Sequence, residues 1–379
     1  MTLNLKQNNM EHTKDLNAFF FHYLKDWNPN RIEFLTLYIL ALMKVQSVNS
    51  SDIATVLNPF TKKESNQRRI ENFFAKQEIN YEIIALMALT ILPVRKYKIS
   101  IDRTNWKYGS KDINIFMLCI NYQGIGIPVY WTCLDKRGNS NTQERIDLLE
   151  AFIKLFGHKK IKYLLADREF VGEDWFKYLK KRKITFYIRI RENFYLHDFD
   201  AKVRVKFLFD RPTPGVYRNG KICGVKLNIV GRRLSKSERK EDNEELLIVA
   251  TNETVSDPLE ILKIYKQRWE IETLFRAYKK KGFNIEDTHI SEPERIRKLV
   301  ALLSLSLIWC YKVGIKYDKC YEPIEIKKHG YKQYSYVKYG LDIMRGIISY
   351  INIKTVEFAN VVLLLTINGF EKSLSNLLE

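Results

Sequence analysis

The chain contains the stretch 257-DPLEILKIYKQRWEIETLFRAYKKKG-282, whose pattern predicts one long helix. Asp257 is a natural N-cap, Pro258 suits the first helical position, and Glu260 completes a capping box. Gly282 is typical of a residue that ends a helix. No helix-breaking residue lies between these signals, so we expect the helix to be continuous.

Four functional side chains recur along this helix: Tyr265, Arg268, Glu272 and Lys279. At about 100° per residue, they fall within roughly 60° of one another. One helix face therefore presents a phenol, a guanidinium, a carboxylate and an ammonium. A solvated face with an ordinary Arg268–Glu272 ion pair, worth a few tenths of a kcal/mol, is the alternative interpretation.

Upstream of the helix, residues 96–190 predict an α/β domain. Apolar alternation and a glycine at 124 indicate three antiparallel strands, followed by a helix, a strand, a helix and a strand. The expected elements are 97–106, 112–123, 125–135, 142–157, 160–169, 173–183 and 184–190. This is the order of an RNase H-like α/β core.

Two aspartates stand at the ends of expected strands, Asp102 on the first and Asp167 on the fourth. A carboxylate at a strand end can project from the rim of a sheet into a cleft. Aspartate also ends strands as an ordinary turn residue, so neither aspartate alone indicates a functional site.

The rest of the chain divides around this core. We expect a helical DNA-binding domain over 1–95, the RNase H-like core over 96–190 and 246–315, a β-rich insertion over 191–245, and a helical C-terminal region over 316–379. Arg68 and Arg69 are candidates for DNA recognition in the first region, which could instead serve packing or dimerisation. Arg232 and Arg233 could hold duplex DNA or belong to a solvated loop.

The composition fits a polyanionic partner. The 379 residues carry a formal charge of +19, which attracts polyanions. A nucleic acid, a membrane surface and a ribosome all fit this charge, and a soluble protein that is basic without such a partner is the alternative. The apolar runs fall short of the roughly 18 residues that cross a bilayer, and no signal peptide is visible, so we expect a cytoplasmic protein without a membrane partner. The five cysteines form no CxxC pair, which argues against a zinc site or a disulfide framework.

The spacing of Tyr265, Arg268, Glu272 and Lys279 matches the Y-(2)-R-(3)-E-(6)-K motif of the insertion-sequence-four family of DDE transposases. The segments 99-ISIDRTNW-106 and 164-LLADREFVG-172 resemble the family's two aspartate blocks, in the right order. The similarity covers roughly residues 60–315. The long gap between Asp167 and Glu272 also matches the family, whose RNase H-like core is split by a β-rich domain.

This resemblance implies a site. Asp102, Asp167 and Glu272 would be the catalytic residues and would hold two Mg²⁺ or Mn²⁺ ions, while Tyr265, Arg268 and Lys279 would bind DNA phosphate. The implied partners are terminal inverted repeats and target DNA, bound by a homodimer in a synaptic complex within the bacterial nucleoid.

Three functions stay open on the sequence. The first is a cut-and-paste transposase, the second a structure-selective nuclease on the same fold, and the third a decayed, non-catalytic DNA-binding copy. In family members that form a DNA hairpin, a tryptophan stacks on a flipped base; here Trp106 and Trp131 are candidates, with a core role as the alternative.

Overall fold

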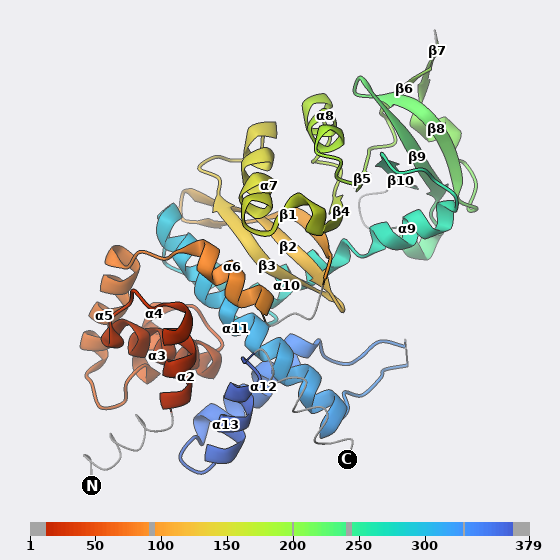
Figure 1. Cartoon of the computed structure of the whole chain (residues 1–379). Coiled ribbons are helices and arrows are strands. Elements are labelled where there is room, and N and C mark those ends of the chain that lie inside the picture. Colours follow the sequence, from red (N-terminus) through yellow and green to blue (C-terminus); the bar gives the residue numbers. More distant parts are fainter. Residues whose placement is uncertain (1–12, 91–94, 199–200, 240–244, 329, 367–379) are drawn as a thin grey trace. The chain divides into compact units, whose positions relative to one another are not determined.

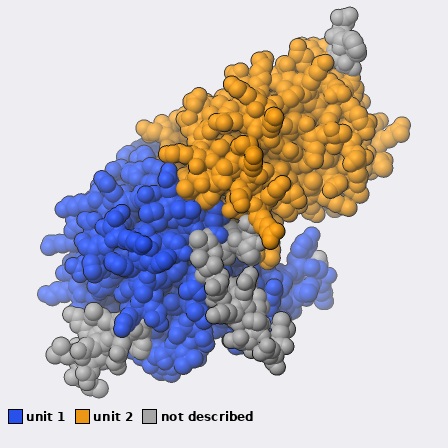
Figure 2. Space-filling view, in the orientation of Figure 1, with its two compact units in different colours: residues 1–93, 106–113, 275–379 blue, residues 94–105, 114–274 orange. Residues whose placement is uncertain are grey.

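The computed structural model describes residues 13–90, 95–198, 201–239, 245–328 and 330–366. The chain forms two compact units (Figure 2). The first comprises residues 1–93, 106–113 and 275–379, and the second comprises residues 94–105 and 114–274.

The amino-terminal part of the first unit is helical. Its helices are α2 (Lys14–Tyr23), α3 (Pro29–Val45), α4 (Ser50–Val56), α5 (Lys63–Lys76) and α6 (Tyr81–Thr90). The Asn28 side chain caps α3, and the Asn49 side chain caps α4. Phe34 of α3 stacks on Phe73 of α5 at 4.6 Å between ring centroids, so aromatic packing joins these helices.

The carboxy-terminal part of this unit is built around α11 (Pro293–Cys320), with α12 (Tyr336–Ser349) and α13 (Thr355–Leu363) beside it. Two glycines allow close packing: a Cβ on Gly340 would lie 1.8 Å from the Cys310 carbonyl oxygen, and one on Gly314 would lie 1.9 Å from that of Tyr336. Helix α11 is longer and more apolar than the sequence suggested. Its length and composition alone would suffice for it to cross a membrane. Its most apolar 18-residue stretch is entirely buried in the protein, which is the pattern of a core helix.

A single mixed sheet of ten strands, in the order β3-β2-β1-β4-β5-β10-β9-β8-β6-β7, dominates the rest of the fold (Figure 1). Strands β1, β4 and β5 run parallel, and the other pairings described are antiparallel. The strands are β1 (Tyr97–Tyr108), β2 (Lys111–Tyr122), β3 (Ile125–Cys133), β4 (Ile161–Ala166), β5 (Phe186–Arg189), β6 (Tyr195–Asp198), β7 (Ala201–Arg204), β8 (Gly215–Ile222), β9 (Val225–Arg233) and β10 (Leu246–Thr251).

The predicted order of three strands, helix, strand, helix and strand over residues 96–190 is confirmed, with α7 (Thr142–Phe156) and α8 (Glu173–Lys181) as the two helices. Residues 191–245 are β-rich, as expected. Their strands continue the same sheet, because β10 pairs with β5 on one side and with β9 on the other.

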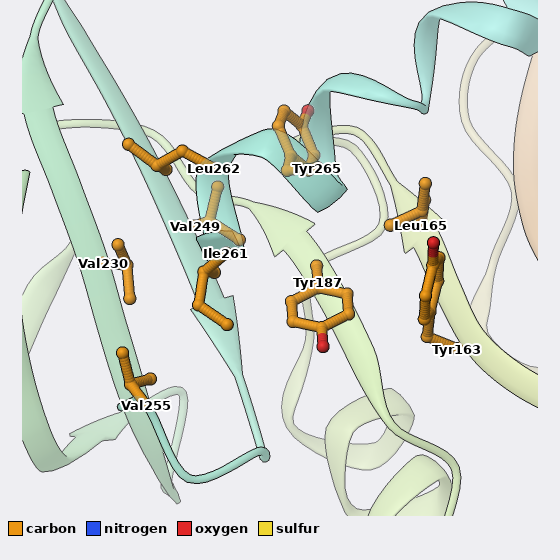
Figure 3. Packing of buried hydrophobic residues seen from close by; sticks show 9 residues of the cluster. All are labelled: Tyr163, Leu165, Tyr187, Val230, Val249, Val255, Ile261, Leu262 and Tyr265. Carbon is orange, nitrogen blue, oxygen red and sulfur yellow. The ribbon is translucent and has the colours of Figure 1, made fainter. Parts of the chain in front are cut away.

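Helices cover both faces of the sheet in the second unit. Helices α7 and α8 lie on one face, where Phe176 of α8 stacks on Phe186 of β5 at 5.3 Å (Figure 1). Helix α9 (Pro258–Lys266) packs on the other face. Figure 3 shows its side chains Ile261, Leu262 and Tyr265 against the strand residues Tyr163, Leu165, Tyr187, Val230 and Val249.

The prediction of one continuous helix over 257–282 is wrong. The chain forms α9 and a second helix, α10 (Trp269–Tyr278), with a break at Gln267 and Arg268. There the backbone amides bond three residues back, to Ile264 and Tyr265. The Gln267 carbonyl accepts a hydrogen bond from the Glu270 amide at 3.1 Å and another from the Asn121 side chain at 2.7 Å. Tertiary hydrogen bonding therefore stabilises a break that the local sequence does not signal.

Candidate active site

The parallel pairing of β1 with β4 brings the two predicted aspartates to neighbouring positions. Ile101 is paired with Ala166, and Asp102 and Asp167 follow these residues directly. Both strands run in the same direction, so the two carboxylates lie where their parallel pairing ends. Asp167 directly follows β4, as expected, whereas the expectation that Asp102 ends its strand is wrong, because β1 extends beyond β4 to Tyr108.

Arg268 connects the first and third predicted carboxylates. Its Nη1 lies 3.3 Å from Asp102 Oδ2, and its Nη2 donates a 2.6 Å hydrogen bond to Glu272 Oε1. The Arg268 side chain is only 6% exposed. The break before α10 therefore leaves Arg268 buried between one carboxylate on the sheet and another on the helix.

The electrostatics of this cluster are strongly coupled. Burial raises the pKa of Asp102 to about 7, although the Arg268 guanidinium and the Arg103 amide oppose the shift, and the Asp167 charge adds to it. Burial lowers the pKa of Arg268, but Tyr265, the two aspartates and Glu272 outweigh burial, so the pKa is raised. Arg268 is therefore cationic, and its charge favours the ionised form of Asp102 against the effect of burial.

The three carboxylates offer the donor chemistry of a hard divalent cation. Asp167 Oδ1 is buried without a hydrogen-bond partner in the described part of the chain, so it is an oxygen with unused acceptor capacity. Among the described residues, no three His, Cys, Asp or Glu side chains already converge as a metal site. The guanidinium of Arg268 lies between Asp102 and Glu272 and contacts both. The residues thus fit a metal site once Arg268 releases the carboxylates.

Tyr265 lies near the end of α9 (Figure 3), three residues before Arg268. The Arg268 guanidinium carbon lies 5.9 Å from the centroid of its ring. Burial raises the pKa of the Tyr265 hydroxyl, so it remains protonated and can act as a hydrogen-bond donor.

The fourth motif residue is placed differently. Lys279 follows the last residue of α10, and its ammonium pairs with Glu286 at 2.8 Å. Both residues belong to the first compact unit, whereas the carboxylate cluster belongs to the second. Of the four residues expected on one helical face, Arg268 and Glu272 form an ion pair, and the Tyr265 ring lies beside Arg268.

The predicted DNA-binding arginines differ in their surroundings. Arg232 pairs with Glu238, and Arg233 shares Glu245 with Arg239, each at 3.0 Å, within the β-rich segment. In α5, Arg68 is exposed, while the half-buried Arg69 lies 5.8 Å from the centroid of the Phe34 ring.

The candidate stacking tryptophans are core residues. Trp106 is 7% exposed and Trp131 is 4% exposed, which leaves neither ring face open to a base. By contrast, Trp269, which directly follows Arg268 and begins α10, is 48% exposed. Its position inside the motif, directly after Arg268, is the sequence signal that points to it.

Arg103 forms a second polar centre that the sequence did not reveal. It donates to both oxygens of Glu169, at 2.7 and 2.8 Å, and to the Asn114 side chain, the Gly138 carbonyl and the Asn139 side chain. These bonds occupy all five N–H donors of the guanidinium. Arg103 therefore has no donor left for DNA and serves to join three segments.

This centre adjoins both aspartates. The backbone amide of Arg103 donates to Asp102 Oδ1 at 2.8 Å, and Glu169 lies two residues beyond Asp167. The Arg145 side chain bonds the Glu169 carbonyl at 2.9 Å and so fixes the same loop to α7. These bonds thus hold the strand at Asp102 and the loop after Asp167 in place.

Comparison with known proteins identifies related chains. Residues 90–309 match the family model described as the transposase DDE domain, a span that contains all three predicted carboxylates. No curated protein matches the sequence. Among solved structures, the chain is similar to the piggyBac transposase in a cryo-EM synaptic complex with hairpin DNA, at 13% identity and a TM-score of 0.42, over 92% of this chain and 73% of that one.

Proposed function

The chain belongs to the transposase DDE domain family, and from that premise we propose that it is a cut-and-paste transposase of the insertion-sequence-four type. It would cut DNA at the ends of its element and join those ends to target DNA. The mixed sheet with β1, β4 and β5 parallel supports an RNase H-like core, which β6 to β9 enlarge.

In this proposal Asp102, Asp167 and Glu272 hold two Mg²⁺ or Mn²⁺ ions. Paired divalent ions can activate an attacking oxygen and stabilise a leaving one at phosphorus. Arg268 has a fork of donors suited to a phosphate, so it can exchange its carboxylate partners for the DNA backbone. The protonated Tyr265 hydroxyl can donate to the same phosphate, and Trp269 offers an exposed ring for stacking on a base.

The observation that carries the proposal is the contact of one buried guanidinium with Asp102 and Glu272, beside Asp167. The residues come from β1, α10 and the end of β4, which are far apart in the sequence. A solvated helix face would not bury Arg268 or link it to the sheet, so the ordinary surface ion pair is a poor account of this geometry.

The decisive experiment compares Glu272→Gln with Glu270→Gln. Glu270 lies on the same helix, but its carboxylate accepts a hydrogen bond from the Gly124 amide at 3.1 Å, outside the cluster. Both proteins would be incubated with a duplex carrying the ends that flank the gene, with Mg²⁺ or with EDTA. We expect Glu272→Gln to bind DNA yet lose cleavage, and Glu270→Gln to cleave.

The outcomes separate the three functions. Cleavage at the repeat boundary that requires Mg²⁺ and Glu272 supports a transposase. Equal cleavage of unrelated duplexes favours the structure-selective nuclease, and binding without any Mg²⁺-dependent cleavage favours a decayed copy. Wild-type cleavage by Glu272→Gln would refute the proposed site.

The proposed partners and location follow from this activity. Terminal inverted repeats and target DNA would be the ligands, two copies of the chain would hold paired ends in a synaptic complex, and the protein would act at the bacterial nucleoid in the cytoplasm. Cross-linking of copies on DNA, compared with and without paired ends, tests the synaptic assembly.

A further inference from the structure

The sheet of the second unit has a second charged edge, opposite the carboxylates. Strands β1, β4 and β5 are parallel, with Tyr97 paired to Ile161 and Leu164 paired to Phe186. Their amino ends therefore meet at one edge, and Asp102 and Asp167 lie toward the other. Over the six residues of β4, the strand spans about 20 Å.

Exposed cations gather at the amino edge because the segments that lead into these strands are basic. The 3-10 turn at His158–Lys160 leads into β4, and α8 ends at Lys181 just before β5. We call the following exposed residues the amino-edge cations: Arg95, Lys96, Lys159, Lys160, Lys162, Lys180, Lys181, Arg182 and Lys183.

Acidic partners are scarce at this edge. Arg182 pairs with Glu150, and Lys180 donates to the Lys226 carbonyl at 3.0 Å. In the described ranges, Lys159, Lys160, Lys181 and Lys183 have no acidic partner. Elsewhere in the same unit, cations are commonly paired, as in Lys136–Glu144, Arg103–Glu169, Arg232–Glu238 and Arg233–Glu245. Glu253, which follows β10, accepts a hydrogen bond from the Tyr187 hydroxyl, and Tyr187 lies on the face of the sheet that α9 covers.

Helix polarity explains only part of this cluster. Lysines in the last turn of α8 interact favourably with its carboxyl end. The lysines at 159, 160 and 162 precede and begin a strand, where no such end is available for all of them. These lysines repel one another, and no helix end offsets this repulsion for all of them. Such an arrangement is expected of a surface that binds a polyanion.

From this arrangement we infer that the amino-edge cations form a second DNA-binding surface, which holds the backbone of duplex DNA without reading its sequence. The inference rests on the proposed DNA-processing function. Most of the cations are lysines, which act as point charges toward phosphate. No large apolar side chain is exposed in 154–162 or 177–183, so this surface lacks the stacking groups of a single-strand site and the apolar anchors of a membrane site.

The surface would hold a DNA segment other than the one being cut. The carboxylates lie at the opposite end of the same strands, so a phosphodiester at Asp102 cannot also contact Lys160. A second duplex, or a neighbouring stretch of the same one, fits this separation. The amino-edge cations would thus retain target or flanking DNA while the carboxylates act on the element end.

The test uses the full chain with Lys159, Lys160 and Lys181 changed together to Gln. A matched control changes Lys111, Lys319 and Lys328, which are exposed lysines of the first unit outside residues 1–95, so the lost charge is equal. The probe is a random-sequence duplex of several helical turns, titrated in EDTA at increasing KCl. We expect the amino-edge variant to bind roughly tenfold more weakly than the control, with a salt slope smaller by about 2 to 3.

Affinity and salt slope equal to those of the control variant would overturn the inference. A greater loss for single-stranded RNA than for duplex DNA would overturn the assignment to DNA. Cleavage of a short duplex that carries one element end should stay within about twofold of wild type; its loss would place these lysines on the cleaved segment and overturn the second surface. Because binding is measured in EDTA, this result is independent of the Glu272→Gln cleavage experiment.

Discussion

Arg103 and Glu169 form a bidentate ion pair, with both carboxylate oxygens accepting hydrogen bonds from one guanidinium, at 2.7 and 2.8 Å. The pair joins the residue after Asp102 to the loop after Asp167. Supporting residues of this kind tune a metal site without touching the metal, because they fix the orientation of its ligands.

Replacing Arg103 by Met should slow Mg²⁺-dependent cleavage by roughly ten- to a hundredfold, the usual range for residues that support metal ligands. Glu169 would lose its partner, and Asp102 and Asp167 would lose a shared restraint. The Mg²⁺ concentration for half-maximal cleavage should rise, while binding of an element end in EDTA should stay close to wild type.

Arg239→Met is the matched control, since Arg239 pairs with Glu245 at 3.0 Å in the same unit but outside the cluster of Asp102, Asp167 and Glu272. A similar loss of thermal stability in both variants, with the altered Mg²⁺ dependence only in Arg103→Met, would support a positioning role. If the Mg²⁺ dependence of Arg103→Met matched wild type, the pair would be structural only.

Arg268→Lys should reduce cleavage by at least about tenfold although the charge is kept. An ammonium is a point charge and cannot reproduce the fork that reaches both Asp102 and Glu272. Single-turnover cleavage of an end duplex measures the effect, and circular dichroism checks the fold. Wild-type cleavage by Arg268→Lys would show that positive charge alone suffices at this position.

The strand and helix order of the core was predictable because its signals are local. Alternation marks β1 to β3, and the capping box of Asn141 and Glu144 marks the start of α7. The break between α9 and α10 was not predictable, because it depends on Asn121 and Tyr163, which lie 146 and 104 residues from Gln267 in sequence. No helix-breaking residue announces it.

The candidate site, like the fold, was predictable from the sequence only in part. Asp102, Asp167 and Glu272 could be selected from motif spacing, and the sheet register explains why the two aspartates meet. The Arg103–Glu169 pair spans 66 residues and exists only because β1 pairs with β4. The burial of Trp106 and Trp131 and the exposure of Trp269 likewise depend on tertiary packing, which the sequence pattern does not contain.

The two tryptophans Trp269 and Trp131 should respond to truncation in opposite ways. Trp269→Ala should weaken binding of an element end with a change in unfolding free energy below about 1 kcal/mol, because the ring is half exposed. Trp131→Ala should cost about 3 to 5 kcal/mol of stability through a cavity in the core. Chemical denaturation and DNA titration of both variants check this, and a stability loss in Trp269→Ala equal to that of Trp131→Ala would contradict it.

Lys312 should make the stability of the first unit depend on pH. Its ammonium is buried and donates to the Leu364 carbonyl at 2.7 Å, and burial lowers its pKa to about 8. An unfolded lysine titrates near 10.4. Between these pKa values the unfolded chain binds more protons than the folded chain, so unfolding free energy should rise with pH, with a slope approaching about 1.4 kcal/mol per pH unit.

Denaturation of wild type and Lys312→Met from neutral to alkaline pH isolates this contribution, because other groups cancel in the difference. Parallel curves for the two proteins would show that Lys312 remains protonated in the folded chain across this range.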